Sequence, residues 1–205
     1  TLGVMYALGN GVAQDFAEAI EWYRKAAEQG NIYAQNNLGG MYDKGEGVPQ
    51  DDVEAVKWYR KAAEQGYVDA QINLSLMYDE GRGVPQDDAQ VAKWLRKAAE
   101  QGYMQGQYNL GLMYALGDGV AQDLGEAVKW YRKAAEQEYA YAQYNLGTMC
   151  RNGDGVPKNN TEAVKWYSKA AEQGHVDAQN NLGWMYDKGD GVLKNKTEAA
   201  KWYRK

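Results

Sequence analysis

The sequence predicts an all-α fold, a right-handed superhelix (solenoid) of tandem helix-turn-helix repeats. The main observation is a period of 36 residues, which positions six tryptophans without insertion or deletion and also positions a Leu-Gly pair and a loop glycine. The tryptophans are Trp22, Trp58, Trp94, Trp130, Trp166 and Trp202. In such proteins each repeat packs only on its neighbours. We therefore expect residues 1–205 to form a single array with a partial repeat 1–30, repeats 31–66, 67–102, 103–138 and 139–174, and a partial repeat 175–205.

One repeat, residues 31–66, illustrates the elements. The spacing predicts a first helix over 31–44, a loop over 45–50 and a second helix over 51–65. Apolar residues share one face of each predicted helix. These residues are Ala34, Leu38, Met41 and Tyr42 in the first helix, and Ala55, Trp58, Tyr59 and Ala62 in the second. A single hairpin cannot bury its tryptophan, so neighbouring repeats must stack.

Helix boundaries carry local signals. Asp51 followed by Glu54 resembles a capping box, in which the two side chains satisfy free amides of the first turn. The pattern recurs as Asp15 with Glu18, Asp87 with Gln90, Asp123 with Glu126, Asn159 with Glu162, and Asn195 with Glu198. Gly45 and Gly66 follow the helix ends, where a left-handed residue closes the last turn. Glu138 replaces the Gly66-type residue in one repeat, which predicts a strained or altered turn there.

Composition excludes several classes of function. A net charge of −5 argues against nucleic acid and anionic membranes as partners, and no apolar run reaches the length of a membrane span. The chain is expected to be soluble, with no membrane insertion. The single cysteine, Cys150, is expected to fill a core position that holds tyrosine in other repeats. The compartment stays open between cytoplasm, periplasm and secretion. Because both ends interrupt a repeat, we expect a piece of a longer array that associates end to end.

Three segments together resemble Sel1-like repeats, relatives of the tetratricopeptide class. They are residues 34–42, the Gly-x-Gly-Val loop at 45–48, and residues 54–63. The resemblance covers the whole chain and implies a right-handed superhelix that serves as an adaptor or scaffold in bacterial protein complexes. The departures from the pattern affect packing. They are Ser75 for Gly, Leu95 for Tyr, Gly106 for Ala and Cys150 for Tyr.

The residues that differ between repeats gather on one side of the first helix, opposite its apolar stripe. We call this set the variable stripe and predict that it lines a concave groove for a protein or peptide partner. Its candidate contact residues are Tyr33, Asn36, Asp69, Ile72, Leu76, Gln105, Tyr108, Leu112, Tyr141, Tyr144, Thr148, Arg151, Asp177, Asn180, Trp184 and Asp187. The same register also holds Gly40, Asp43, Asp79 and Ala115. The alternative is that neighbouring first helices bury part of the stripe between repeats.

Amides that do not vary between repeats have a structural explanation. Gln35, Asn37 and their equivalents are expected to form hydrogen bonds between helices, since polar groups beside a core need partners. The alternative is that they hold the backbone of a ligand.

The sequence contains no set of residues typical of catalysis. His175 is the only histidine, and no Ser/His/Asp set, Cys/His set or metal-ligand spacing is present. The glycine loops lack the strand and lysine of a phosphate-binding loop. We therefore predict no enzyme activity, no cofactor and no metal site. Two alternatives to a binding scaffold remain, an array that presents an active domain outside this chain and an architectural spacer.

Overall fold

The computed structural model describes residues 2–205 and contains, over that range, only α-helices and the loops between them. The all-α class and the tandem helical hairpins that the sequence predicts are confirmed. Thr1, which belongs to the first partial repeat, lies outside the described residues.

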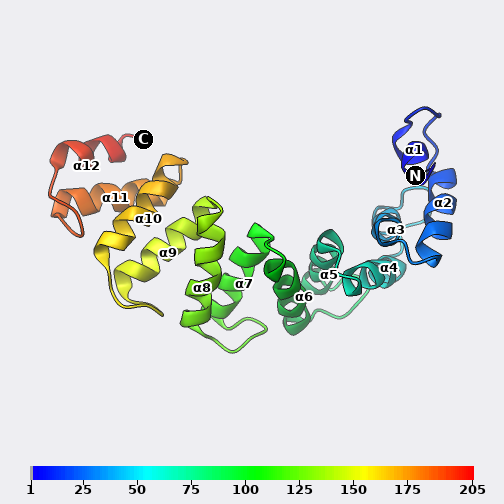
Figure 1. Ribbon diagram of the computed structural model, residues 1–205, viewed down its shortest axis with the longest axis horizontal. Coiled ribbons are helices and arrows are strands. Elements are labelled where there is room, and N and C mark those ends of the chain that lie inside the picture. The colour runs from blue at the N-terminus through cyan, green and yellow to red at the C-terminus, as the bar shows by residue number, and fades with distance from the viewer. Residues whose placement is uncertain (1) are drawn as a thin grey trace. The chain divides into compact units, whose positions relative to one another are not determined.

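The chain divides into two compact units, one that ends at Gln101 and one that begins at Gly102. Unit 1 contains α1 (Leu2–Leu8), α2 (Phe16–Glu28), α3 (Ile32–Lys44), α4 (Asp52–Glu64), α5 (Val68–Glu80) and α6 (Asp88–Glu100). Unit 2 contains α7 (Met104–Leu116), α8 (Leu124–Glu136), α9 (Ala140–Asn152), α10 (Asn160–Glu172), α11 (Val176–Lys188) and α12 (Lys196–Tyr203). Within each unit, every helix packs against the next one along the chain (Figure 1).

The apolar stripes of the two helices face the core as predicted. On α3, Leu38 and Met41 are buried, and on α4, Trp58 and Tyr59 are buried. Trp58 belongs to a core cluster formed mainly by α2 and α3, so the tryptophan of one repeat is covered by the repeat before it. Stacking of the hairpins thus removes Trp58 from water, whereas Trp22 in the first hairpin stays 37% exposed.

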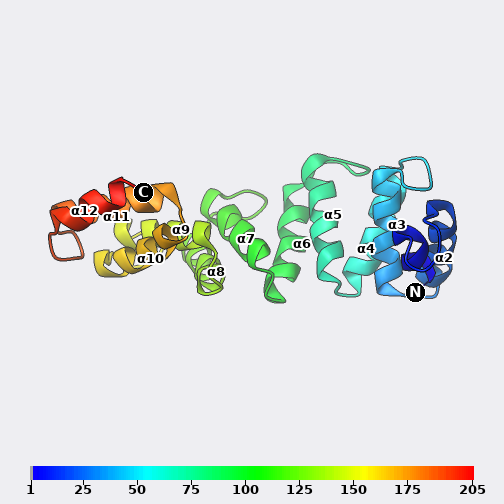
Figure 2. The same ribbon diagram turned by 90° about the horizontal axis from the view of Figure 1, so that it is seen from above.

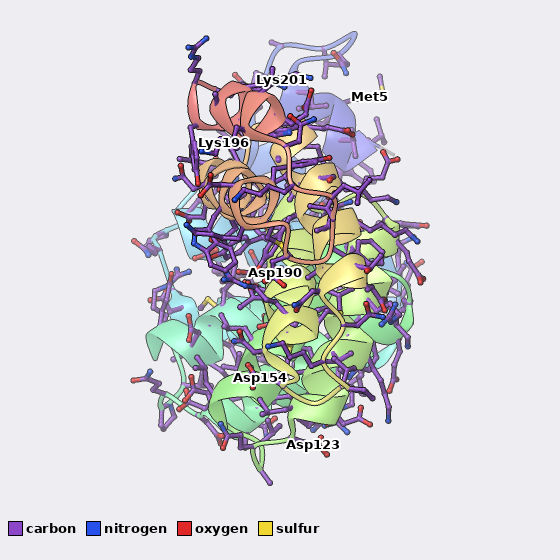
Figure 3. All side chains as sticks on the ribbon, turned by 90° about the vertical axis from the view of Figure 1, so that its left-hand side faces the viewer. Met5, Asp123, Asp154, Asp190, Lys196 and Lys201 are labelled. Atoms are coloured by element: carbon purple, nitrogen blue, oxygen red, sulfur yellow. The ribbon has the colours of Figure 1, made fainter. Side chains whose placement is uncertain are left out.

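Each second helix begins after an Asp or Asn that caps it. The Asp51 carboxylate accepts from the backbone N–H groups of Val53 and Glu54 at 3.0 Å, and α4 begins at Asp52, one residue later than predicted. The corresponding bond from the third helical residue recurs at the other five caps. Asp123 holds this place at the start of α8 (Figure 3).

The second half of the predicted capping box is wrong. The Asp51 N–H donates to the Tyr42 carbonyl oxygen at 2.9 Å, and the other five cap N–H groups donate to the equivalent carbonyls. Because the loop already gives the cap amide an acceptor, Glu54 is free to pair with Lys57 Nζ at 2.9 Å instead.

The loops after the first helices join neighbouring repeats. Gly83 has φ 66°, and a Cβ there would lie 2.2 Å from the Asp52 carbonyl oxygen of the preceding repeat. Gly155 has φ 69°, and a Cβ there would lie 2.3 Å from the Leu124 carbonyl oxygen. Figure 2 shows the loops after α3 and α5 on the same edge of unit 1. Glycine is therefore required at these positions both by conformation and by space.

The turns between repeats use a left-handed residue, as predicted for Gly66, which has φ 93°. Glu138 occupies the equivalent position with φ 67° and is the only non-glycine residue with positive φ in the described range. The turn at Glu138 therefore keeps the left-handed conformation and is strained, because this conformation costs about 1–2 kcal/mol for a residue with a side chain.

Candidate interaction surface

The variable stripe lies on α3 and α5 in unit 1 and on α7, α9 and α11 in unit 2. All sixteen candidate contact residues are exposed or half-buried, and none is buried. Several are large and apolar, with Tyr33 62% exposed, Tyr141 56% exposed and Trp184 37% exposed. Leu76 and Leu112 are also exposed. The core does not account for these side chains, since it is built from the opposite face of the same helices.

In unit 2 the stripe tyrosines form a continuous aromatic cluster across three repeats. The Tyr108 ring centroid lies 5.1 Å from that of Tyr139 and 6.3 Å from that of Tyr141. Tyr141 lies 5.1 Å from the ring of His175. Tyr108 and Tyr144 are half-buried, whereas Tyr141 is exposed to solvent.

His175 is a member of this cluster that sequence reasoning missed. Its ring stacks on Tyr144 at 4.6 Å with an interplanar angle of 17°. Its Nδ1 accepts from the Ala178 N–H at 3.4 Å and caps the start of α11. A signal was present, because the equivalent positions hold Tyr67, Tyr103 and Tyr139, and Tyr67 packs on the stripe residue Tyr33 at 5.3 Å.

Trp184, which departs from the 36-residue register, has a cation above its ring. The Arg151 guanidinium carbon lies 4.2 Å from the ring centroid. Both residues belong to the stripe, one on α9 and one on α11. This cation–π contact leaves the indole partly exposed.

In unit 1 the stripe is more acidic and contains a cavity. Asp69 and Asp79 are exposed, and the Tyr67 hydroxyl donates to Asp69 at 2.8 Å. Partial burial and this neighbouring carboxylate raise the pKa of Tyr67 to about 12. A cavity of about 350 Å³ opens beside Gly40 and is lined by residues of α1, α2, α3, α4 and α5. Asp43 lines it and is held by Arg82 and by the Tyr59 hydroxyl.

The constant glutamines connect helices, as predicted. Gln35 Nε2 donates to the Ala27 carbonyl at 3.1 Å, and its Oε1 accepts from Gln65 at 2.7 Å. Gln143 repeats both bonds, to Ala135 and from Gln173. The constant asparagines are more exposed. Asn73 Nδ2 donates to the stripe residue Asn36 at 3.2 Å, so this amide lies at the edge of the stripe.

The described residues offer little chemistry outside this surface. Within 2–205, no group of three or more His, Cys, Asp or Glu side chains is arranged to hold a metal ion. Cys150 is buried in the core of unit 2, where burial raises the pKa of its thiol. No helix in the same range combines the length and apolar character needed to cross a bilayer.

Comparison with known proteins gives a consistent result. The Sel1 repeat model matches six segments, at residues 2–31, 32–67, 68–103, 105–139, 140–175 and 176–205. The chain is similar to a protective antigen of uropathogenic Escherichia coli that displays an SLR fold, with 42% identity and a TM-score of 0.90 over 99% of this chain and 44% of that one. It is also similar to a Sel1 repeat protein of Oxalobacter formigenes, with 35% identity and a TM-score of 0.86 over 99% of this chain and 82% of that one. The chain thus spans less than half the length of the E. coli relative.

Proposed function

The chain belongs to the Sel1 repeat family, and on that premise we propose that it binds a protein or peptide partner along the variable stripe, on the concave face of the array. Sel1 repeat proteins are non-catalytic scaffolds that generally mediate protein–protein interaction. We propose the surface that is used, the variable stripe, and the kind of partner, a protein or peptide. The observation that supports this proposal most is that the stripe exposes an apolar side chain in every complete repeat.

The energetics support this use of the stripe. Exposed tyrosine and tryptophan are the residues that contribute most to protein interfaces, because each buries a large area with little loss of side-chain freedom. The stripe places Tyr141 and Trp184 on neighbouring helices, and the aromatic cluster beneath Tyr141 fixes its ring in advance. A preorganised surface loses less entropy when a partner binds.

The choice of test residues follows from the packing. Alanine at Tyr108 or Tyr144 would remove a half-buried ring from the cluster and lower stability, so neither substitution separates binding from folding. Tyr141→Ala with Trp184→Ala removes the exposed rings instead. Val53→Ala with Leu193→Ala is the matched control, since these residues are 63% and 89% exposed and lie outside the stripe.

The experiment is affinity capture from bacterial lysates and candidate host fluids, followed by a dissociation constant for each purified partner. We expect the double stripe variant to bind at least about tenfold more weakly, and the control variant to bind as the natural chain does. Partners that bind both variants equally, or no partner at all, would reject the stripe and favour the spacer or the array that presents a distant domain.

A further inference from the structure

Gly40 gives unit 1 a polar cavity in the variable stripe. The equivalent positions hold Leu76, Leu112, Thr148 and Trp184. A cavity of about 350 Å³ lies at Gly40, a volume comparable to small-molecule binding sites. The missing side chain thus leaves space in this repeat where the stripe is otherwise occupied.

The cavity is lined mainly by polar side chains, and two of them are carboxylates. Glu46 is half-buried, and its carboxylate has no ion-pair or hydrogen-bond partner among residues 2–205. Asn73 gives an Nδ2 hydrogen to Asn36, which leaves the Asn73 amide oxygen available. Asp43 adds a second carboxylate, which Arg82 and the Tyr59 hydroxyl already pair, so the unpaired charge is that of Glu46. Lys44 is the one cation among the described lining residues and is exposed.

The net charge of unit 1 is negative, like that of the carboxylates in the cavity. Residues 1–101 contain 10 Lys and Arg against 16 Asp and Glu, a formal charge of −6, whereas residues 102–205 contain 13 against 12, a charge of +1. The stripe of unit 1 also exposes Asp69 and Asp79 beside the apolar Leu76. A cationic ligand is therefore favoured over an anionic one both in the cavity and around it.

We propose that the cavity at Gly40 binds the basic side chain, an arginine above all, of a partner segment lying on the stripe. A guanidinium has five donors and no acceptor, which suits the Glu46 carboxylate and the free Asn73 amide oxygen. The carboxylates that line the site would repel an acidic side chain. The inference takes the partner to be a peptide segment and in that respect rests on the proposed function.

Two substitutions test the cavity without disturbing the fold. Gly40→Leu fills it with the side chain that two other repeats carry at this position, and a Cβ at Gly40 would meet only the Tyr59 hydroxyl, at 3.5 Å. Leucine also favours a helix interior more than glycine does. Glu46→Gln removes the unpaired charge. Glu64→Gln, on the exposed face of α4, makes the same change in net charge away from the cavity and is the matched control.

The experiment follows the backbone amide of residue 40 and the Asn73 side-chain amide by NMR, using the whole chain. The probes are the N-acetyl, N′-methylamide derivatives of arginine, lysine, norleucine and glutamate at millimolar concentration. We expect a saturable shift with arginine and a weaker one with lysine, about tenfold weaker binding in Glu46→Gln, no binding in Gly40→Leu, and no change in Glu64→Gln. Equal shifts from norleucine or glutamate, no shift from arginine, or binding that survives Gly40→Leu would overturn the inference.

This outcome is separable from that of the capture experiment, which changes Tyr141 and Trp184 and leaves the cavity intact. A partner that depends on the stripe, together with a cavity that does not bind arginine, would overturn only the inference about the basic side chain. Arginine binding in the cavity without any partner that depends on the stripe would overturn only the proposed function.

Discussion

At the residue scale, a glycine on the first helix of a repeat packs against a tyrosine on the second. A Cβ at Gly39 would lie 2.7 Å from Tyr59 Cδ1, too close for the ring to stay in place. The same contact joins Gly111 to Tyr131 and recurs in the remaining Gly-Tyr repeats. The glycine therefore creates the space that the ring fills.

Ser75 and Leu95 occupy these two positions in the repeat that departs from the rule. Both are buried, and the Ser75 hydroxyl donates to the Ile72 carbonyl at 2.7 Å. A serine needs room for its Cβ and hydroxyl, and a leucine reaches less far than a tyrosine. We infer that the two departures compensate for each other.

A double-mutant cycle tests this compensation. We expect Leu95→Tyr alone to lower the free energy of unfolding by about 1–3 kcal/mol through overpacking. Ser75→Gly alone should cost about 0.5 kcal/mol in helix propensity. The double variant should recover to within roughly 1 kcal/mol of the natural chain, as measured by urea titration. Additive losses in the double variant would show that the two sites are independent.

In the sequence, Ser75 and Leu95 are separate departures from the pattern, because the contact between positions 20 residues apart appears only once the hairpin is folded. The buried Cys150 and the interhelical Gln35 were predicted correctly, since a residue at a core position or beside it has few alternatives. The role of His175 depends on the neighbouring rings, and the cavity at Gly40 depends on side chains from five helices and a loop, so neither was predicted.

At the element scale, a glycine in the loop after the first helix is more constrained than a glycine between repeats. Gly155 must have positive φ and has no room for a Cβ beside the Leu124 carbonyl. Gly174, between repeats, also has positive φ, but a Cβ there would have no neighbour within 4 Å. Gly155 therefore constrains how two repeats stack, and Gly174 only closes a turn.

Alanine at the two positions separates conformational strain from steric overlap. Gly174→Ala should cost about 1–2 kcal/mol, the usual cost of a left-handed residue with a side chain. Gly155→Ala should cost at least about 1–2 kcal/mol more, because the backbone of α8 has to move. Urea titrations of both variants provide the comparison, and equal losses would mean that the loop adjusts freely.

The type of the helices, and their bounds to within one residue at each end of α3 and α4, were predictable because the period, the caps and the glycines agree with one another. The second half of the capping box was not. Its residues fit the motif, but in the folded loop the Tyr42 carbonyl already accepts the hydrogen bond from the cap amide. That bond depends on the path of the loop, which the local sequence motif does not encode.

At the scale of the whole molecule, the two units differ in net charge and in aromatic contacts although the same period runs through both. The scaffold residues repeat in both units, yet the acidic excess lies in residues 1–101 and the aromatic cluster lies in unit 2. We therefore expect the two units to contact chemically different parts of a partner. Repeat periodicity alone predicts a uniform surface, and only the residues that differ between repeats break that uniformity.

Buried tyrosines make the stability of both units sensitive to alkali. Burial is the main cause that raises the pKa of Tyr131 from 10.0 to about 12, and burial likewise raises the pKa of Tyr59 strongly. The folded chain thus keeps phenolic protons that the unfolded chain releases above pH 10. Stability from these groups is full below pH 10 and is lost as the pH rises towards 12, of the order of 2 kcal/mol for Tyr131.

We therefore expect helical circular dichroism to be lost in the same pH interval in which the buried tyrosines ionise, as monitored by tyrosinate absorbance. Tyr131→Phe keeps the buried ring and removes the proton. Its free energy of unfolding should fall less steeply with pH, even though losing the hydroxyl costs about 1 kcal/mol at neutral pH. Lysine deprotonation affects both chains equally, so the difference between them isolates Tyr131. If all tyrosines ionised near pH 10 while the helices stayed intact, then burial would not be controlling the pKa of these side chains.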